Sequence, residues 1–255
     1  MKIITLNANG IRAAQRKGFF DWMKQQEADV VCIQETKAQL HQLDPKLFVP
    51  AGHHFYQADA VKKGYSGVSI YTKHQPQTVR YGIDWPEFDQ EGRWVEVDLG
   101  DLIVASLYLP SGSAKEERQA FKYLCMERLE PVLDNLKNKD KPFVVCGDWN
   151  IAHKKIDIKN WRGNQKNSGF LPEEREWMSN LFEQKNLVDA FRVAEPGEHQ
   201  YSWWSNRGQA WANNTGWRID YHITSPCLKD KVKSAHIYKD ERFSDHAPVV
   251  IEYDL

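Results

Sequence analysis

The sequence has few cysteines and no long hydrophobic run, and each shortage excludes a class of protein. Its four cysteines are widely spaced and lie mostly in apolar stretches, at Cys32, Cys125, Cys146 and Cys227. That distribution is typical of reduced core residues in a cytosolic protein rather than of a disulfide or zinc framework. No apolar run approaches the ~20 residues that span a bilayer, and the mean hydropathy is −0.66. The first residues also lack the apolar core of a secretion signal, so we expect a cytoplasmic protein with no membrane partner.

Neither sign of charge predominates in the chain, because it has 34 basic and 35 acidic residues and a formal net charge of −1. The chain as a whole is therefore not a basic nucleic-acid-binding protein, and a local patch would have to hold any polyanion. Residues 151–170 offer such a patch, with five basic residues, one acidic residue and many amides. The composition suits a phosphate backbone, although for a charge run alone a solvated loop is the better interpretation.

Tryptophan, by contrast, is abundant. Four of the ten tryptophans lie between Trp203 and Trp217, in a stretch rich in amides that also contains Arg207. Aromatic side chains in such surroundings can stack on bases or sugars. Trp203 and Trp204 fit the two faces of a core strand equally well, and the sequence leaves these two interpretations level.

Apolar patterning predicts alternating strands and helices, which is typical of an α/β fold. Residues 93–99 alternate as a half-exposed strand does, whereas 143–146 are uniformly apolar, as in a strand covered on both faces. Strands are predicted over residues 2–6, 29–33, 67–71, 93–99, 102–109, 142–146, 217–223 and 247–253. One helix is predicted over 114–137, with Pro131 kinking or dividing it, and another begins near Pro172. No linker-like stretch interrupts the chain, so we expect residues 1–255 to form a single domain.

Polar residues follow these strands where each one ends, and ligands bind at such edges of α/β sheets. The group consists of Asn7, Glu35, Tyr108, Asp148, Asn150, Asp220, Asp245 and His246. Crowded carboxylates repel one another unless a cation lies among them, and a hard ion such as Mg²⁺ suits oxygen ligands. A metal and a positioned base are what phosphodiester hydrolysis needs. Taken singly, Asp148 could be a turn residue, His246 a core histidine and Glu35 a helix-start acid, so the weight lies on the joint pattern.

The joint pattern extends over nearly the whole chain in a fixed order. Its stretches are Asn7–Arg12, Ile33–Lys37, Gly64–Val68, Asp89–Arg93, Tyr108–Pro110, Gly147–His153, Gly216–Tyr221 and Ser244–His246. In these stretches the sequence resembles the exonuclease III family of apurinic/apyrimidinic endonucleases, within the endonuclease/exonuclease/phosphatase superfamily. The resemblance implies a four-layer α/β sandwich, in which two mixed β-sheets pack face to face with helices on the outside.

The resemblance also implies a metal site and a way to activate water. Glu35 matches the main metal ligand, with Asp245 near the same ion and Asn7 beside them, and Mg²⁺ is the expected cofactor, with Mn²⁺ as a substitute. Asp148 matches the residue that deprotonates or orients the attacking water. Its partner in this scheme is His246, held by Asp220, and the division of labour between Asp148 and His246 stays open.

Other matching positions face the nucleic acid. Asn7 and Asn150 match amides that hold the scissile phosphate, and Tyr108 matches a tyrosine beside it. Further residues fall where the family contacts DNA, shapes the site or borders the pocket for an extruded sugar: Lys37, Tyr65, Arg93, Ser168, Trp203, Arg207 and Trp217. Two positions differ from part of the family. Asn9 replaces an aspartate near the metal, which leaves the metal count open, and Arg207 replaces an apolar wedge, which leaves the mode of DNA distortion open.

The function that the resemblance implies is a Mg²⁺-dependent DNA-repair phosphodiester hydrolase. It would cleave 5′ to abasic sites in double-stranded DNA, with 3′-phosphodiesterase, 3′-phosphatase and 3′→5′ exonuclease side activities on 3′-blocked ends. We expect it to act as a monomer. Two alternatives remain, a non-catalytic nucleic-acid-binding regulator on the same fold and a phosphatase for lipid or inositol headgroups. The regulator is disfavoured by the complete set of acids and amides in 147–150, Glu35 and Asp245.

Overall fold

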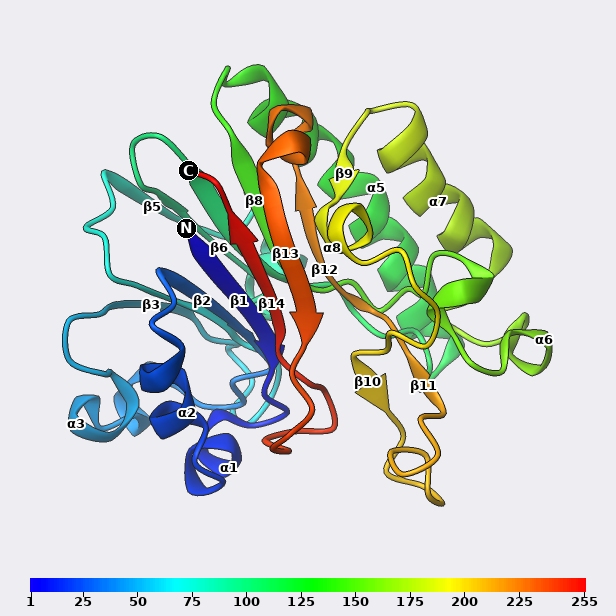
Figure 1. Cartoon of the computed structure of the whole chain (residues 1–255), viewed down its shortest axis with the longest axis horizontal. Coiled ribbons are helices and arrows are strands. Elements are labelled where there is room, and N and C mark those ends of the chain that lie inside the picture. The colour runs from blue at the N-terminus through cyan, green and yellow to red at the C-terminus, as the bar shows by residue number, and fades with distance from the viewer.

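The computed structural model describes residues 1–255 and contains two six-stranded sheets (Figure 1). The first sheet has the order β13-β14-β1-β2-β4-β3, formed by Val232–Ile237, Val249–Tyr253, Lys2–Asn7, Val30–Gln34, Val68–Thr72 and His54–Ala58. The second has the order β5-β6-β7-β8-β12-β9, formed by Thr78–Tyr81, Trp94–Asp98, Ile103–Tyr108, Phe143–Asp148, Asp220–Thr224 and Val188–Asp189. A two-stranded ribbon of β10 (Trp203–Trp204) and β11 (Gly216–Trp217) precedes β12.

Both sheets are mixed. β1 runs parallel to β2, and β7 runs parallel to β8, whereas the other neighbouring strands pair antiparallel. Parallel neighbours end at the same edge of a sheet. The ends of β7 and β8 therefore lie side by side, with Tyr108 paired to Asp148.

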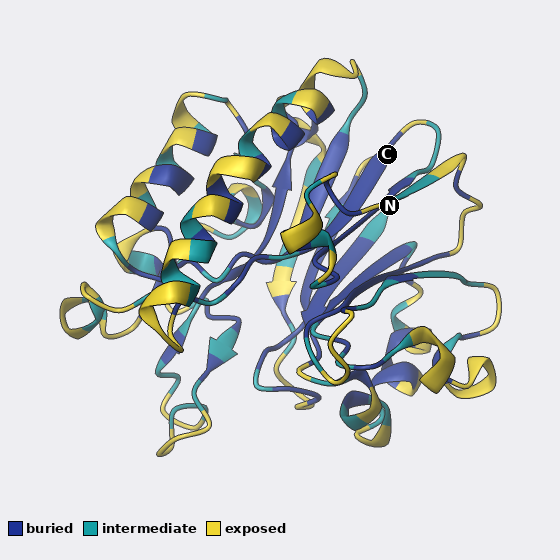
Figure 2. Ribbon diagram, turned by 180° about the vertical axis from the view of Figure 1, so that it is seen from behind, coloured by how far each residue is buried: buried dark blue, intermediate teal, exposed yellow.

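The layer between the two sheets is apolar, which explains why the sheets pack face to face. It is built from alternate residues of the central strands, among them Val30, Cys32, Val68, Ile70, Val95, Val97, Val104 and Val144. The residues between them point outward, so Val31 and Ile33 of β2 belong to the core on the other face of the first sheet. Strands covered on both faces read as continuous apolar runs, and Figure 2 shows these strands buried in the middle of the molecule.

Helices cover the two outer faces and complete four layers. α1 (Ile11–Arg16) and α2 (Phe19–Gln26) lie on the first sheet, and α5 (Glu116–Asn138) and α7 (Pro172–Glu183) lie on the second (Figures 1 and 2). The short helices are α3 (Pro45–Phe48), α4 (Pro86–Asp89), α6 (Trp161–Asn164), α8 (Ala190–Ala194), η1 (Leu40–Gln42), η2 (Lys155–Asp157) and η3 (Pro226–Lys231). None of the helices combines the length and the apolar character needed to cross a membrane. The four-layer α/β sandwich is confirmed.

Two of the predicted elements differ from the structure, and four strands of the sheets, β3, β5, β9 and β13, lie outside the predicted ranges. The strand expected over 217–223 is split, because Trp217 pairs with Trp203 in the ribbon and β12 begins only at Asp220. The long helix α5 continues through Pro131 and is not divided. A proline inside a helix costs roughly 3 kcal/mol, and burial of its neighbours Val132 and Leu133 against the second sheet offsets that cost.

Candidate active site

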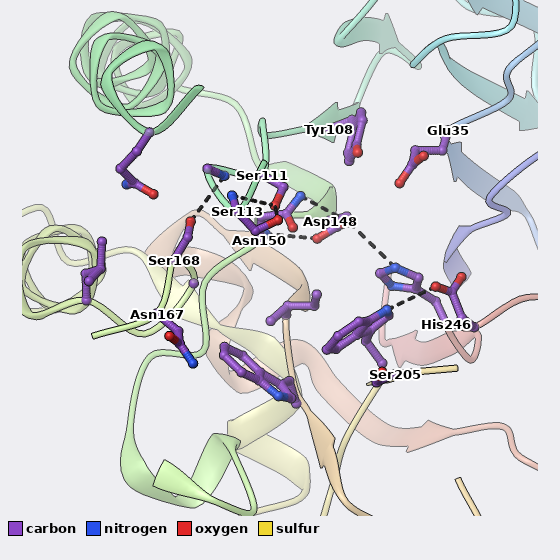
Figure 3. Close-up of a pocket in the computed structure, with 18 of the residues that line it drawn as sticks. Glu35, Tyr108, Ser111, Ser113, Asp148, Asn150, Asn167, Ser168, Ser205 and His246 are labelled. Atoms are coloured by element: carbon purple, nitrogen blue, oxygen red, sulfur yellow. Dashed lines mark hydrogen bonds and ion pairs between the residues drawn. The ribbon is translucent and has the colours of Figure 1, made fainter. Parts of the chain in front are cut away.

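The polar residues that end the strands meet at one edge of the sandwich. The register of the second sheet places Tyr108 and Asp220 on either side of Asp148. β1 and β2 end nearby at Asn7 and Gln34. A cavity of about 900 Å³ opens at this edge, and its lining includes Glu35, Tyr108, Asp148, Asn150, Ser168, Trp203, Arg207, Trp217, Asp245 and His246 (Figure 3). Most of the candidate residues are therefore brought together.

Asp148 is buried at the end of β8, and its carboxylate is held in one orientation. Oδ1 accepts a hydrogen bond from the backbone N–H of Asn150 at 2.9 Å. Oδ2 accepts from the side-chain amides of Asn7 at 2.9 Å and of Asn150 at 3.3 Å. The preceding residue is Gly147, where a Cβ would lie 1.9 Å from the carbonyl oxygen of Leu107. Glycine therefore allows the close approach of β8 to β7 that places Asp148.

His246 lies between two aspartates. Its Nδ1 is 2.9 Å from Oδ2 of Asp220, which orients the imidazole, and its Nε2 is 3.9 Å from Oδ2 of Asp148. Figure 3 shows the imidazole directed toward Asp148. The hydroxyl of Ser202 donates to the same Asp220 oxygen at 2.6 Å. The other Asp220 oxygen is buried without a partner, so the negative charge of this cluster is incompletely compensated.

The pKa values of Asp148 and His246 are both strongly raised. Burial and the neighbouring Asp220 carboxylate raise the pKa of Asp148 to about 7, against the effect of His246 and the amides. Burial alone would lower the pKa of His246, but the carboxylates of Asp220 and Asp148 raise it to about 10. Near neutral pH the imidazole of His246 is therefore positively charged, and the carboxyl group of Asp148 can readily gain or lose a proton.

Glu35 and Asp245 present carboxylate oxygens beside this cluster, whereas the amide oxygen of Asn7 accepts from the backbone N–H of Asn9 at 2.9 Å. Asn7 donates to Oε1 of Glu35 at 2.9 Å, and the Lys37 ammonium lies 2.8 Å from Oε2. Lys37 also contacts the amide oxygen of Asn9, whose amide nitrogen donates to Oδ1 of Asp245 at 3.0 Å. A cationic group thus already sits against Glu35, and carboxylate and amide oxygens are the ligands that Mg²⁺ prefers. These residues fit a divalent ion.

A tighter group of potential ligands is Asp148, Asp220 and His246, whose ligand atoms lie within 4.8 Å of one another. In that group Nδ1 of His246 and Oδ2 of Asp220 already bind each other, and the same Asp220 oxygen accepts from the Ser202 hydroxyl. Glu35 and Asp245 remain the better predicted ligands.

Tyr108, Arg93 and Tyr65 form one network on the side of the cavity next to Glu35. Arg93 is buried, and its guanidinium donates to Glu91 at 2.6 Å, to the carbonyl of Tyr108 at 3.0 Å and to the Tyr65 hydroxyl at 3.1 Å. Arg118 binds the same Glu91 carboxylate and the same hydroxyl. The contacts of Arg93 therefore suit a residue that shapes the site around Tyr108 better than one that contacts DNA directly. Burial and the Glu35 carboxylate raise the pKa of Tyr108 well above its usual range, so it stays a neutral phenol.

The opposite wall is built from Trp203, Trp217 and the loop around Ser168. The two indole rings meet edge to face at 6.0 Å, and Trp203 Nε1 donates to Oδ2 of Asp245 at 3.1 Å. Ser168 accepts from the backbone N–H of Gly112 at 3.1 Å. These contacts settle Trp203 as part of the site wall and of the ribbon, whereas Trp204 is core.

The basic side chains lie around the rim. Arg207 is exposed on the loop between β10 and β11 and lines the cavity. In the basic stretch 151–170, Lys166 also lines the cavity, whereas Lys155 and Arg162 lie over the Trp161 ring at 4.2 and 4.5 Å from its centroid. The stretch therefore presents a cationic surface that reaches the cavity at Lys166.

Several residues of the site have no signal in the sequence pattern. Ser202 binds Asp220, Arg118 binds Glu91, and Lys122 and Glu174 bind the backbone of the cavity wall. Except for the bond from Gly169 to Glu174, each of these contacts joins residues that are far apart along the chain. Only the partners could have been recognised as parts of motifs.

Comparison with known proteins agrees with this geometry. A family model described as the endonuclease/exonuclease/phosphatase family matches residues 4–246. The chain is 42% identical to an exodeoxyribonuclease of Bacillus subtilis over 98% of both chains. It is 36% identical to the DNA repair nuclease APEX1 of Danio rerio, over 98% of this chain and 81% of that protein. Among solved structures, an AP endonuclease from Archaeoglobus fulgidus superimposes with a TM-score of 0.92 at 26% identity, with full coverage of both chains.

Proposed function

Because the chain belongs to the endonuclease/exonuclease/phosphatase family, we propose that it is a DNA-repair hydrolase that cleaves the backbone 5′ to abasic sites in duplex DNA. The names of its relatives, exodeoxyribonuclease and DNA repair nuclease, support DNA as the substrate. Removal of 3′-phosphates and other 3′-blocking groups and 3′→5′ exonuclease activity are side reactions of the same site. The enzyme acts as a cytoplasmic monomer. A non-catalytic regulator receives no support, since these relatives are named as nucleases.

The observation that carries the proposal is the pair of Asp148 and His246 at the floor of the cavity. The carboxylate has a pKa near the working pH, and the imidazole beside it is held protonated by Asp220. A general base works best when its pKa lies near the ambient pH. A buried cation that donates hydrogen bonds suits a phosphoryl oxygen that gains charge in the transition state.

In the proposed function Asp148 is the base and His246 is the hydrogen-bond donor, a division of labour that the sequence leaves open. Asp148 takes a proton from water, whose oxygen bonds to phosphorus. The bond from phosphorus to the 3′-oxygen of the preceding nucleotide breaks, and the departing oxygen takes a proton from solvent. This leaves a 3′-hydroxyl on that nucleotide and a phosphate on the abasic sugar. His246 donates a hydrogen bond to the phosphoryl oxygen, Asn150 and Asn7 hold the phosphate, and Tyr108 lies beside it as a neutral donor.

Glu35 and Asp245, assisted by Asn7, would hold Mg²⁺, with Mn²⁺ as a substitute. When bound, such an ion neutralises phosphate charge and stabilises the leaving oxygen. The Lys37 ammonium already rests against Glu35, so the two cations would share that carboxylate or exchange places on it.

Of the remaining predicted residues, Lys37, Tyr65 and Arg207 offer donors and positive charge to the duplex, whereas buried Arg93 shapes the site behind Tyr108. Ser168, Trp203 and Trp217 form the wall of a pocket for the extruded abasic sugar. An abasic nucleotide leaves the helix more easily than a paired one because it has lost its base pair and most of its stacking. A small pocket between a loop and two indoles suits a sugar without its base.

The test is cleavage of a duplex with one abasic-site analogue, followed on a gel. Incision on the 5′ side should stop completely in excess chelator and return on addition of Mg²⁺ or Mn²⁺, because the carboxylates of Glu35 and Asp245 need a cation to work on a phosphate. A duplex that lacks the abasic site is the control and should stay intact at the same enzyme concentration. Undiminished incision in excess chelator would overturn the metal assignment, and no incision under any condition would overturn the function.

A further inference from the structure

A fully buried ion pair lies behind the cavity wall. Lys122 of α5 and Glu174 of α7 have no exposed side-chain surface, and Nζ of the lysine lies 2.5 Å from Oε1 of the glutamate. Burial lowers the pKa of Lys122, against the charges of Glu174 and Asp148. Removing two charges from water is unfavourable, and apolar side chains of similar volume often stabilise a core as well. Joining two helices is therefore a weak explanation for this pair.

The contacts of Lys122 lead to the phosphate side of the cavity. Its ammonium also donates to the carbonyl oxygen of Asn150 at 2.8 Å. Asn150 has a positive φ of 52°, its backbone N–H binds Asp148, and its side chain donates to the carbonyl of Leu109 at 2.7 Å. The lysine thus holds the backbone carbonyl of Asn150, the residue whose backbone and side-chain amides are directed at Asp148.

The contacts of Glu174 lead to the sugar side of the same cavity. Oε2 accepts from the backbone N–H groups of Gly169 at 2.6 Å and of Leu171 at 3.1 Å. The bond to Leu171 is the ordinary capping box of a helix start, but the bond to Gly169 reaches beyond it. Gly169 has a φ of 91°, and a Cβ there would lie 3.0 Å from the carbonyl oxygen of Asn150. The loop and Asn150 are therefore in contact, and one ion pair holds both.

The two helices have other connections that could hold them together. Lys185, just after α7, pairs with Asp134 of α5 at 2.8 Å, and Trp177 Nε1 donates to Glu130 at 3.0 Å. Neither connection touches a residue that lines the cavity. In Figure 3, Ser168 lies beside Asn150 on the side away from His246, which is where the ion pair binds the loop.

We propose that Lys122 and Glu174 are positioning residues that hold Asn150 and the loop 168–171 at a fixed separation. The scissile phosphate and the extruded sugar are then presented to Asp148 as one unit. This inference rests on the proposed function, because that function assigns the phosphate to Asn150 and the sugar to the loop. The pair touches neither group and acts through the backbone of Asn150, Gly169 and Leu171 and through the hydroxyl of Ser168.

The test uses the full chain with the double substitution Lys122→Met/Glu174→Gln, which leaves no buried charge and keeps one oxygen that can accept from the loop. Its thermal midpoint should stay close to that of the wild type. The single-turnover rate on the abasic duplex should fall about ten- to a hundredfold, since a small misplacement of reacting groups has effects of that size. The Kd for DNA should change by less than about threefold, because phosphate contacts elsewhere dominate affinity.

A second measurement reports the loop without using activity. Amide hydrogen exchange followed by mass spectrometry should be faster in peptides that cover 149–152 and 166–171 in the double variant, and unchanged elsewhere in the sandwich. Lys185→Met is the matched control, because it removes an ion pair between the same helices at a place remote from the cavity. Its turnover and its exchange in these two peptides should equal those of the wild type.

The outcomes separate the possible explanations. A double variant with wild-type turnover would overturn the proposal, and so would one that does not fold, because the pair would then hold the helices together. A turnover loss in Lys185→Met equal to that of the double variant would also count against it. If the wild type itself does not incise abasic duplexes, the proposed function fails, while the exchange measurement still decides whether the pair orders the two segments.

Discussion

Asp148 and Asp157 are both buried and lie nine residues apart, yet the pKa of Asp148 is raised to about 7 and that of Asp157 is lowered to about 2. Burial raises the pKa of both carboxyl groups and is the largest influence on each. The difference therefore comes from their neighbours. Comparing the two sites shows what distinguishes a charge that stabilises the fold from one that is available for chemistry.

Asp157 belongs to a balanced cluster of two acids and two arginines. Its Oδ1 accepts from Arg218 at 2.8 Å and from Arg192 at 2.6 Å. Arg218 also grips both oxygens of Asp189, at 3.1 and 2.6 Å. Bidentate arginine–carboxylate pairs combine charge with matched geometry. Both carboxylates here have a cationic partner, and against the effect of burial the arginines lower the pKa of Asp157.

Asp148 belongs to an unbalanced cluster, in which His246 lies between Asp148 and Asp220 as the single cation. Like charge from Asp220 and burial both disfavour ionisation of Asp148. Groups in a cavity whose pKa is shifted toward neutral pH are typical of catalytic sites. The balanced cluster should therefore matter for stability and the unbalanced one for turnover, and three substitutions or conditions test this division.

Asp157→Asn should destabilise the protein by about 3 to 5 kcal/mol, because removing one partner of a buried pair leaves an uncompensated charge. Turnover on an abasic duplex, measured below the melting transition, should stay close to that of the wild type. Urea unfolding at pH 7 gives the first quantity and single-turnover kinetics the second. A large loss of turnover in folded Asp157→Asn would show that the two clusters are not independent.

Asp148→Asn should show the reverse pattern. Turnover should fall at least about a hundredfold, the lower end for loss of a positioned acid or base. Affinity for DNA should be largely retained, since phosphate contacts elsewhere dominate it. Stability at pH 7 to 8 should rise or stay level, because the substitution removes like-charge repulsion with Asp220. Equal losses of affinity and rate, or clear destabilisation, would make Asp148 a structural residue.

The smallest expected effect is a loss of folding stability at acid pH. The folded pKa of Asp157, about 2, lies below its unfolded value of 3.8, so its contribution to stability is present above pH 4 and is lost as the pH falls toward 2. The linkage amounts to about 2 kcal/mol. The stability difference between wild type and Asp157→Asn, measured by urea unfolding at pH 5, 4 and 3, should shrink accordingly. A difference that stays constant over this range would mean that Asp157 keeps its ordinary pKa.

Inner and outermost strands of the sheets differ in how well the sequence predicts them. Most inner strands of the two six-stranded sheets are predicted because apolar side chains on both faces produce continuous hydrophobic runs. β6 is predicted from its alternation instead, although the structure buries it on both faces. The four strands of these two sheets that the pattern misses, β3, β13, β5 and β9, are the outermost ones. Most of their residues are partly or fully exposed. Their pairing is set by the neighbouring strand rather than by their own composition.

In the site, too, some features follow from the local sequence and others from contacts between distant residues. The sequence by itself determined the central strands, the sandwich architecture through its resemblance, and the acids, amides and histidine at the strand ends, because residue type at a strand end is a local property. It assigned Asp220 to His246 only through the resemblance and gave no role to Arg218, although Asp220 joins the unbalanced cluster and Arg218 the balanced one. It also gave no sign of Lys122, Glu174, Ser202 or Arg118. Only the tertiary structure decided these roles, because Coulombic and hydrogen-bond energies depend on distances across space, and those distances join residues that lie far apart along the chain.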